Sequence, residues 1–285
     1  MYKIFLLSMI VALPALGGCG TRRDDAAAEK GAASHGEGRR SAKQRAEEEA
    51  RAKKAIEELQ GADEAALVAA LNHEDRRVRR AALQMITEQD LRSETAIEGI
   101  IPRLADHWAP VSRAAKQALV GIGEPAVAPL IAAFGSNSPH RNLSFSKGGK
   151  DGGTSIRTVI KDTLGEIGEP AVPALIEALE NSDPLIRRNA IGALGRIGPR
   201  AAAAIPALVH ALEKDNDATV RLNALGDLGL IAPLEPKLEP AARAALNADD
   251  PRLRKTANKT IENIERARRE SGGADSGVPA AKTGE

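Results

Sequence analysis

A pair of apolar stripes recurs along most of the chain. In one unit, Leu175, Ile176 and Leu179 lie three and four residues apart, which places them on one face of a helix. A second, Ala-rich stripe follows and begins with Ile186. Polar residues at 181–184 separate the two stripes, and Asp and Ser at such positions favour a turn and a helix N-cap. The pattern therefore predicts two helices joined by a short turn.

The same unit returns at a nearly constant interval. The second stripe begins with an aliphatic residue at Val78, Val111, Ile156, Ile186, Val220 and Leu253, at spacings of 33, 45, 30, 34 and 33 residues. Several of the second helices end in a Gly that is soon followed by Pro, which is typical of a helix stop. One hairpin cannot bury its apolar side alone, so such units stack. We predict an all-α fold, an α-solenoid of about six helical hairpins in a right-handed superhelix.

The unit at residues 169–198, EPAVPALIEALENSDPLIRRNAIGALGRIG, closely resembles a HEAT-like repeat of the group named after phycobilisome lyases. The resemblance covers residues 61–264. It implies a stack of HEAT-like hairpins whose second helices line the inner, concave side. A repeat of this kind specifies the fold and not an activity.

The amino terminus has the features of a secretory signal peptide over residues 1–18. Lys3 precedes an apolar run from Ile4 to Leu13, which is too short for a comfortable membrane span. The sequence Leu16-Gly17-Gly18-Cys19 resembles the bacterial lipobox. The resemblance implies cleavage before Cys19 and fatty acylation (palmitate) there, which would make the chain a membrane-anchored lipoprotein of the bacterial cell envelope.

Gly20 after the cysteine favours the outer membrane if the host is Gram-negative. The alternative is an ordinary signal peptide in which Cys19 is incidental, but Cys19 is the single cysteine of the chain and stands where the motif needs it.

The remaining segments differ in composition. Residues 19–40 are rich in Ala, Gly and charge, which predicts a flexible tether. Acid–base pairs four residues apart predict a charged helical stem at 41–60. Within the solenoid, the Gly- and Ser-rich insertion at 135–153 predicts a loop. Residues 265–285 are predicted to be a disordered tail.

Composition argues against several functions. The formal net charge is +1, so we expect no nucleic-acid binding. His107, His140 and His210 are scattered without metal-ligand spacing. The pair His73-Glu74 is similar to the iron-binding pairs of deoxyhypusine hydroxylases, another group of HEAT-repeat proteins, but that family needs several pairs and one is present. We therefore expect no metal, no cofactor, no small-molecule substrate and no enzymatic activity.

Arginine follows the aliphatic residue in five of the six units. We interpret this Arg as structural, with its stem packed on the next hairpin and its charge paired with a turn Asp, rather than as an anion-binding ladder. The arginines are Arg79, Arg157, Arg187, Arg221 and Arg254, and the expected partners are Asp75, Asp183, Asp217 and Asp250.

Other positions of the second helices are better binding candidates. Residues four apart on one helix face, pointing away from the core, would line the concave side. They form a mildly basic surface with a smooth stretch of Gly in the fourth and fifth units, and a merely solvated face is an equal alternative. The predicted contact residues are Arg80, Gln84, Arg113, Gln117, Thr158, Asp162, Arg188, Lys255 and Lys259.

The sequence thus predicts a lipid-anchored HEAT-like scaffold that binds a protein partner through its concave face. One alternative is an accessory or enzymatic envelope protein with a site between the inserted loop and the concave face, where His140, Arg141 and Lys150 could gather. The other is a passive structural spacer.

Overall fold

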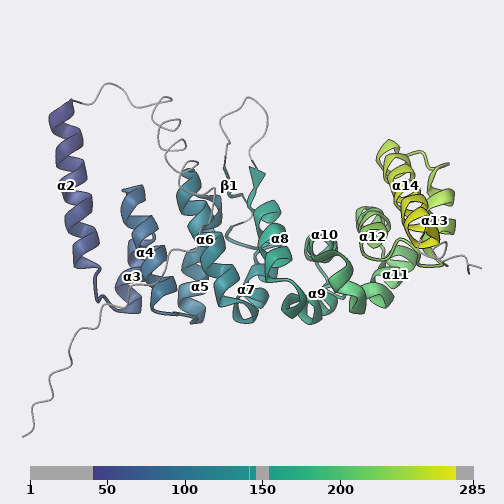
Figure 1. Cartoon of the computed structure of the whole chain (residues 1–285), viewed down its shortest axis with the longest axis horizontal. Coiled ribbons are helices and arrows are strands. Elements are labelled where there is room, and N and C mark those ends of the chain that lie inside the picture. The colour runs from purple at the N-terminus through teal and green to yellow at the C-terminus, as the bar shows by residue number, and fades with distance from the viewer. Residues whose placement is uncertain (1–40, 141, 146–153, 274–285) are drawn as a thin grey trace, which may run out of the picture. The chain divides into compact units, whose positions relative to one another are not determined.

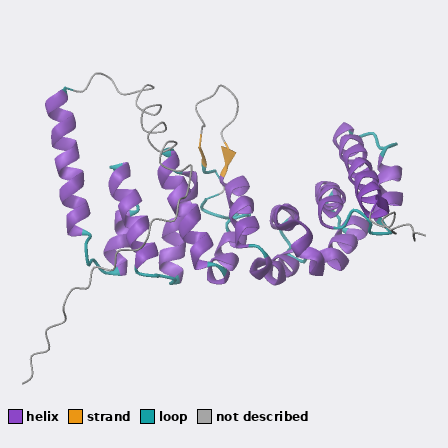
Figure 2. Cartoon of the chain, viewed as in Figure 1, coloured by secondary structure: helices purple, strands orange, loops and turns teal. Residues whose placement is uncertain are grey.

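Six helical hairpins follow one another in the computed structural model, which describes residues 41–140, 142–145 and 154–273. The predicted leader, Cys19 and the tether lie outside these ranges. Helix α2 (Ala42–Glu58) comes first and contacts the second helix of the first hairpin. Figure 1 shows the first helices of the hairpins below the second helices, and Figure 2 shows that almost all ordered elements are helical.

Each hairpin has a short first helix and a longer second one. The first helices often open with a 3-10 turn (η); they are α3 (Glu64–Ala70), α5 (Glu94–Ile100) with η1 (Ile101–Ala105), η2 (Glu124–Ala126) with α7 (Val127–Ala132), η3 (Glu169–Ala171) with α9 (Val172–Ala178), η4 (Gly198–Ala204) with α11 (Ile205–Lys214), and α13 (Leu238–Ala245). The second helices are α4 (Arg76–Glu88), α6 (Ala109–Ile122), α8 (Ile156–Ile167), α10 (Pro184–Ile197), α12 (Ala218–Ile231) and α14 (Pro251–Gly273).

Consecutive second helices pack against one another, and each also packs on the first helix of its own hairpin. Between them runs one continuous core of Leu, Ile, Val and Ala, closed at single places by Trp108 and Phe134. Burying these stripes in every hairpin is the main source of stability, since each unit supplies apolar area that only its neighbours can cover. The prediction of an all-α repeat fold is confirmed.

The turns between paired helices share one hydrogen-bond pattern. The Asp that precedes the second helix is its N-cap: Asp75, Asp183 and Asp217 each accept a hydrogen bond from a backbone N–H in the first turn of the helix. Two residues earlier, another side chain closes the turn, as where Asp215 accepts from the backbone N–H of Asp217. His73 does the same through Nδ1 toward the N–H of Asp75, so His73 has a structural role in its turn.

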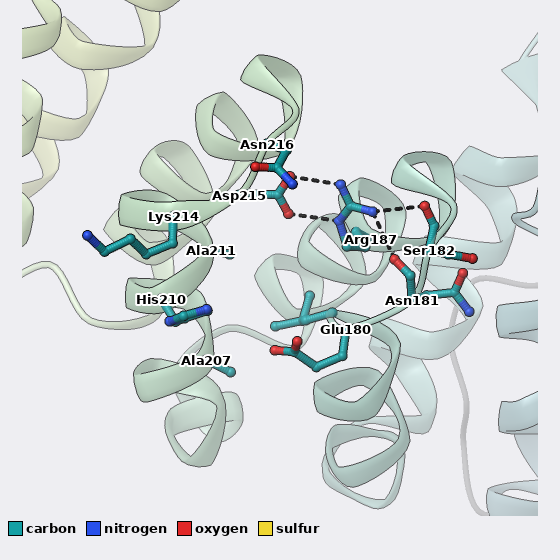
Figure 3. Close-up of a pocket in the computed structure, with 11 residues that line it drawn as sticks. Glu180, Asn181, Ser182, Arg187, Ala207, His210, Ala211, Lys214, Asp215 and Asn216 are labelled. Atoms are coloured by element: carbon teal, nitrogen blue, oxygen red, sulfur yellow. Dashed lines mark hydrogen bonds and ion pairs between the residues drawn. The ribbon is translucent and has the colours of Figure 1, made fainter.

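The repeated Arg is structural, as predicted, but its acidic partner differs from the prediction. Arg187 donates to the backbone carbonyls of Asn181 and Ser182 in its own turn. It also forms a two-pronged ion pair with Asp215, the first residue of the next turn, at 2.8 Å from each oxygen (Figure 3). The Arg187 hydrogen bonds hold the pKa of Asp215 below its ordinary value. The predicted acids were wrong because the N-cap bonds already occupy them.

The same arginine clamp joins the first two hairpins and is missing where the next turn lacks an acid. Arg79 binds the carbonyls of His73 and Glu74 and forms a two-pronged pair with Asp106, at 2.8 and 3.0 Å. Arg254, in contrast, binds only carbonyls of its own turn among the described hydrogen bonds. The second hairpin has Ser112 at the Arg position, and its hydroxyl donates to the carbonyl of Leu104.

Two boundaries differ from the sequence predictions. Helix α14 continues to Gly273, so residues 265–273 are helical rather than a disordered tail. Arg268 of this extension pairs with Glu239 of α13. In the inserted segment, strands β1 (Ser144–Phe145) and β2 (Thr154–Ser155) pair in antiparallel register. The start of the insertion is also tied down, since the backbone N–H of Ser136 donates to Asp183 at 2.7 Å.

Replacing Arg79 by Met tests the arginine clamp. The side chains of Arg79 and Asp106 are 5% and 3% exposed, so removal of the Arg leaves a buried carboxylate unpaired. We expect the free energy of unfolding in urea to fall by about 3 kcal/mol. The matched control is Arg254→Met, at the equivalent but exposed position without an acidic partner in the following turn, with an expected loss of about 1 kcal/mol or less. Equal losses in the two variants would contradict the clamp.

Candidate functional site

The predicted contact residues all lie on the second helices and are exposed or half-buried. We define the second-helix face as the side of these helices that carries them. Gln84, Gln117, Lys255 and Lys259 are exposed, as is Arg113, while the other predicted residues are half-buried: Arg80, Thr158, Asp162 and Arg188. The structure thus leaves every one of them accessible to a partner. It brings Asp162 into an ion pair with Arg196 of the next second helix, with 3.3 Å between Nε and Oδ1.

The predicted smooth stretch of Gly is wrong, because neighbouring side chains cover these glycines. A methyl group added at Gly192 of α10 would lie 2.9 Å from Cδ of Lys161, which comes from α8. A methyl group at Gly195 would overlap the carboxylate of Asp227, which comes from α12, and lie 2.7 Å from its Cγ. Gly192 and Gly195 are one turn apart on the same face of α10. Side chains from the two flanking helices therefore meet over a helix that contributes no side chain there.

Gly165 of α8 permits an even closer approach between helices. A methyl group there would lie 2.7 Å from Cβ of Arg196 and 3.4 Å from its backbone carbon. Backbone and Cβ atoms cannot rotate away as a flexible side-chain end can, so the contact fixes the distance between α8 and α10. Further along, Gly229 of α12 receives Thr260 of α14 in the same manner, at 3.2 Å from its Cγ2.

Asp227 is the carboxylate that this arrangement perturbs most clearly. Burial over α10 raises its pKa from the ordinary 3.8 to about 6, and the positive charges of Lys161 and Arg196 oppose the rise. The pKa of Lys161 is lowered, first by burial, while the charge of Asp227 acts in the opposite direction. Three successive hairpins thus place two basic groups and a carboxylate of unusual acidity in one cluster. Sequence reasoning missed Lys161, Arg196 and Asp227 because it considered only positions four apart on each single helix.

Charge is divided unequally between the two layers of helices. The six second helices hold 19 Arg and Lys against 7 Asp and Glu, a formal net charge of +12. The first helices with their 3-10 segments hold 4 basic against 8 acidic residues, a net charge of −4. If the five arginines of the turns are set aside, the second helices still carry 14 basic against 7 acidic side chains. A chain that is nearly neutral overall therefore presents a basic layer.

A polar cavity of about 350 Å³ lies at the turns of the fourth and fifth hairpins (Figure 3). The clamp of Arg187 and Asp215 forms one wall, and His210 and Lys214 of α11 line another. Glu180, Asn181, Ser182 and Asn216 complete the polar lining. Its main charged pair is already bonded to itself and to turn carbonyls, so the cavity has the character of a gap between turns rather than a catalytic site.

A second cavity of about 330 Å³ lies beside His140, at the start of the insertion. Burial lowers the pKa of His140, and Glu98 of α5 opposes the shift. The cavity is lined by residues of the first helices, including Ile101 and Pro129. His140 therefore lies against the first helices and not toward the second-helix face, contrary to the location considered for an enzymatic site. Arg141 and Lys150 lie outside the described residues.

Two searches of the described residues had negative results. Among residues 41–140, 142–145 and 154–273, no group of three or more His, Cys, Asp or Glu is arranged to hold a metal ion. No helix in those same ranges is both long enough and apolar enough to cross a bilayer.

The sequence model of HEAT repeats matches residues 64–143 and 154–229, which together make up more than half of the 285 residues. The chain belongs to the HEAT-repeat family. The matched ranges extend from the first hairpin into the second helix of the fifth, and the break between them falls within the inserted segment. No curated protein sequence matches the chain.

Several solved structures of repeat proteins resemble this HEAT-repeat chain at low identity. The CpcE and CpcF complex of phycocyanin lyase from Nostoc sp. PCC7120 is 19% identical, with a TM-score of 0.39, over 59% of this chain and 99% of that one. The archaeal HEAT-like repeats protein from Thermococcus onnurineus NA1 is 16% identical, with a TM-score of 0.36, over 75% and 92%. Human deoxyhypusine hydroxylase is 19% identical, with a TM-score of 0.32, over 75% and 89%.

Replacing Gly165 by Ala tests the close approach of the second helices in this HEAT-repeat stack. The added methyl group collides with Cβ of Arg196, so we expect a loss of about 1 to 3 kcal/mol in the free energy of unfolding. Gly121 of α6 is the matched control, because an added methyl group there meets nothing within 4 Å. Gly121→Ala should be neutral or stabilising by up to about 1 kcal/mol, as Ala is the better helix former. A neutral Gly165→Ala variant would disprove the contact.

Proposed function

We propose that this HEAT-repeat protein is a lipid-anchored scaffold that binds an acidic, extended protein segment along its second-helix face. The unequal division of charge between the two layers of helices carries the proposal. Stacked repeats create an extended surface, and residues from successive units recur along it at regular intervals. A basic surface of this kind is complementary to an acidic chain and increases the rate of association with it.

Two features favour a protein segment over nucleic acid. The chain has one Trp, one Tyr and three Phe, so few aromatic side chains are available for base stacking. Of the aromatic residues in the described ranges, Trp108 and Phe134 are buried in the core. The exposed basic groups alternate with the amides of Gln84 and Gln117, which suit the backbone of an extended peptide.

The anchoring part of the proposal rests on the lipobox at Leu16–Cys19. Two or three acyl chains on one residue hold a protein on a membrane stably, where one chain does not. The proposed location is the bacterial cell envelope, in the outer membrane if the host is Gram-negative. The segment between Cys19 and the first HEAT repeat then sets the distance of the binding surface from the lipid.

Replacing Cys19 by Ser tests the anchor. The hydroxyl cannot take the thioether-linked lipid, so the variant should keep its leader and incorporate no labelled palmitate in cells grown with the fatty acid. The wild-type chain should be labelled and should partition into the detergent phase. Labelling of the variant at the wild-type level would overturn the proposed anchor and leave the binding surface unaffected.

Reversing two charges tests the binding surface. Arg80→Glu combined with Arg188→Glu alters the first and fourth hairpins, and each residue is half-buried on the second-helix face. The probe is a rhodamine-labelled peptide of alternating Glu and Gly, titrated into the detergent-solubilised full chain. We expect the dissociation constant to rise about tenfold or more, equivalent to about 1.4 kcal/mol, because attraction becomes repulsion at two sites.

The control carries the same change of charge on the first helices. Arg200→Glu with Lys214→Glu alters two exposed residues of η4 and α11. If both double variants weaken the peptide equally, net charge rather than the second-helix face determines binding. Vesicles of anionic lipid serve as a competitor, and preferential binding to these vesicles would replace the protein segment by a membrane surface as the ligand.

A further inference from the structure

We infer that the carboxylate of Asp227 occupies the position on the second-helix face where a carboxylate of the acidic partner binds, and that the partner enters by displacing it from Lys161 and Arg196. The inference rests on the proposed function and specifies where on the face, and against which internal competitor, binding takes place. It assigns to Asp227 the part of a built-in competitor for the basic groups.

The floor of this position is made by α10. Because Gly192 and Gly195 have no side chains, the helix leaves a shallow strip on which other groups rest. The stem of Lys161 lies over Gly192, with 3.6 Å from Nζ to the position of an added methyl group. Asp227 lies over Gly195 from the opposite side. The two flanking hairpins therefore place opposite charges on the same strip.

The groups around Asp227 give the site an excess of positive charge. Helix α8 supplies Lys161 and Asp162, and α10 supplies Arg188 and Arg196, the last of which is paired with Asp162. From the other side, α14 places Thr256 and Thr260 against glycines of α12, while its charged residues near them are exposed: Lys255, Lys259 and Glu262. Removing the charge of Asp227 increases the net positive charge of this cluster by one.

The carboxylate is poorly suited to a purely structural role. Burial raises its pKa to about 6, so in the fold the ionised form is less stable than it would be in water. At about pH 7.5 Asp227 is ionised and competes with a ligand for Lys161 and Arg196, and at about pH 5.5 it is mostly protonated and does not compete. Glu side chains of a flexible peptide remain mostly ionised at both values. Affinity for an acidic segment should therefore increase as the pH falls.

The experiment measures binding of the same rhodamine-labelled Glu-Gly peptide to the full chain at about pH 7.5 and about pH 5.5. Wild type should bind about three- to tenfold more tightly at the lower pH. Asp227→Asn should bind with that higher affinity at both values, since the amide fills the same space without charge. Any pH dependence that remains in the variant measures the histidines, so the difference between the two proteins isolates Asp227.

Two further variants make the result specific. Glu177→Gln removes one negative charge from α9, on the first-helix side, and should leave the affinity as in wild type. Lys161→Met keeps the apolar stem over Gly192 and removes the charge, and should weaken binding in wild type and in Asp227→Asn. Far-ultraviolet circular dichroism of each variant confirms that the helices are intact.

The outcomes separate the two proposals. If Asp227→Asn binds like wild type while Arg80→Glu with Arg188→Glu weakens binding, the second-helix face is correct and the role of Asp227 is overturned. If Asp227→Asn and Glu177→Gln tighten binding equally, the effect is one of net charge and the assigned position is again overturned. If no variant binds the peptide, both the position and the proposed acidic ligand are wrong.

Discussion

The close approach of consecutive second helices is the constraint on which the rest of this structure depends. Gly165 allows α10 to reach α8 so closely that Cβ of Arg196 fills the space of the missing side chain. Gly195 and Gly229 admit Asp227 and Thr260 from the following helices in the same way. Because helices in contact through glycine leave no room for their own side chains, the surface above each helix is built by its neighbours. Binding properties of this face therefore belong to groups of three hairpins rather than to single repeats.

The basic character of that face follows from how the repeat uses paired arginines. In Arg79-Arg80 and Arg187-Arg188, successive residues project about 100° apart around the helix. The first Arg of each pair turns toward the turn carbonyls and the Asp of the next hairpin, where its charge is neutralised. The second Arg remains on the second-helix face, half-buried. Stability and positive potential thus come from adjacent positions of one motif, and altering one does not require altering the other.

Sequence pattern was sufficient for whatever a single hairpin determines. Apolar periodicity gave the helices, the turn residues gave the N-caps at Asp75, Asp183 and Asp217, and the repeated Arg was correctly interpreted as structural. What failed depends on contacts between hairpins. The acid that meets Arg187 is Asp215, 28 residues away, and the groups that cover Gly192 and Gly195 come from α8 and α12. The helical extension to Gly273 is likewise supported from outside, by Glu239 of α13.

Asp227 shows how a local inconsistency can direct attention to function. An uncharged residue of the same shape would fit over Gly195 without the penalty that burial imposes on an ionised carboxylate, so folding alone gives no reason for an acid there. By contrast, the acids of the turns have lowered pKa values, as at Asp215, because hydrogen bonds to Arg187 and to backbone N–H groups favour their ionised forms. Within one fold, one class of carboxylate is stabilised by its surroundings and another is held against them. Positions at which a protein maintains such an unfavourable ionised group, next to accessible basic side chains, are those where a ligand's charge can take its place.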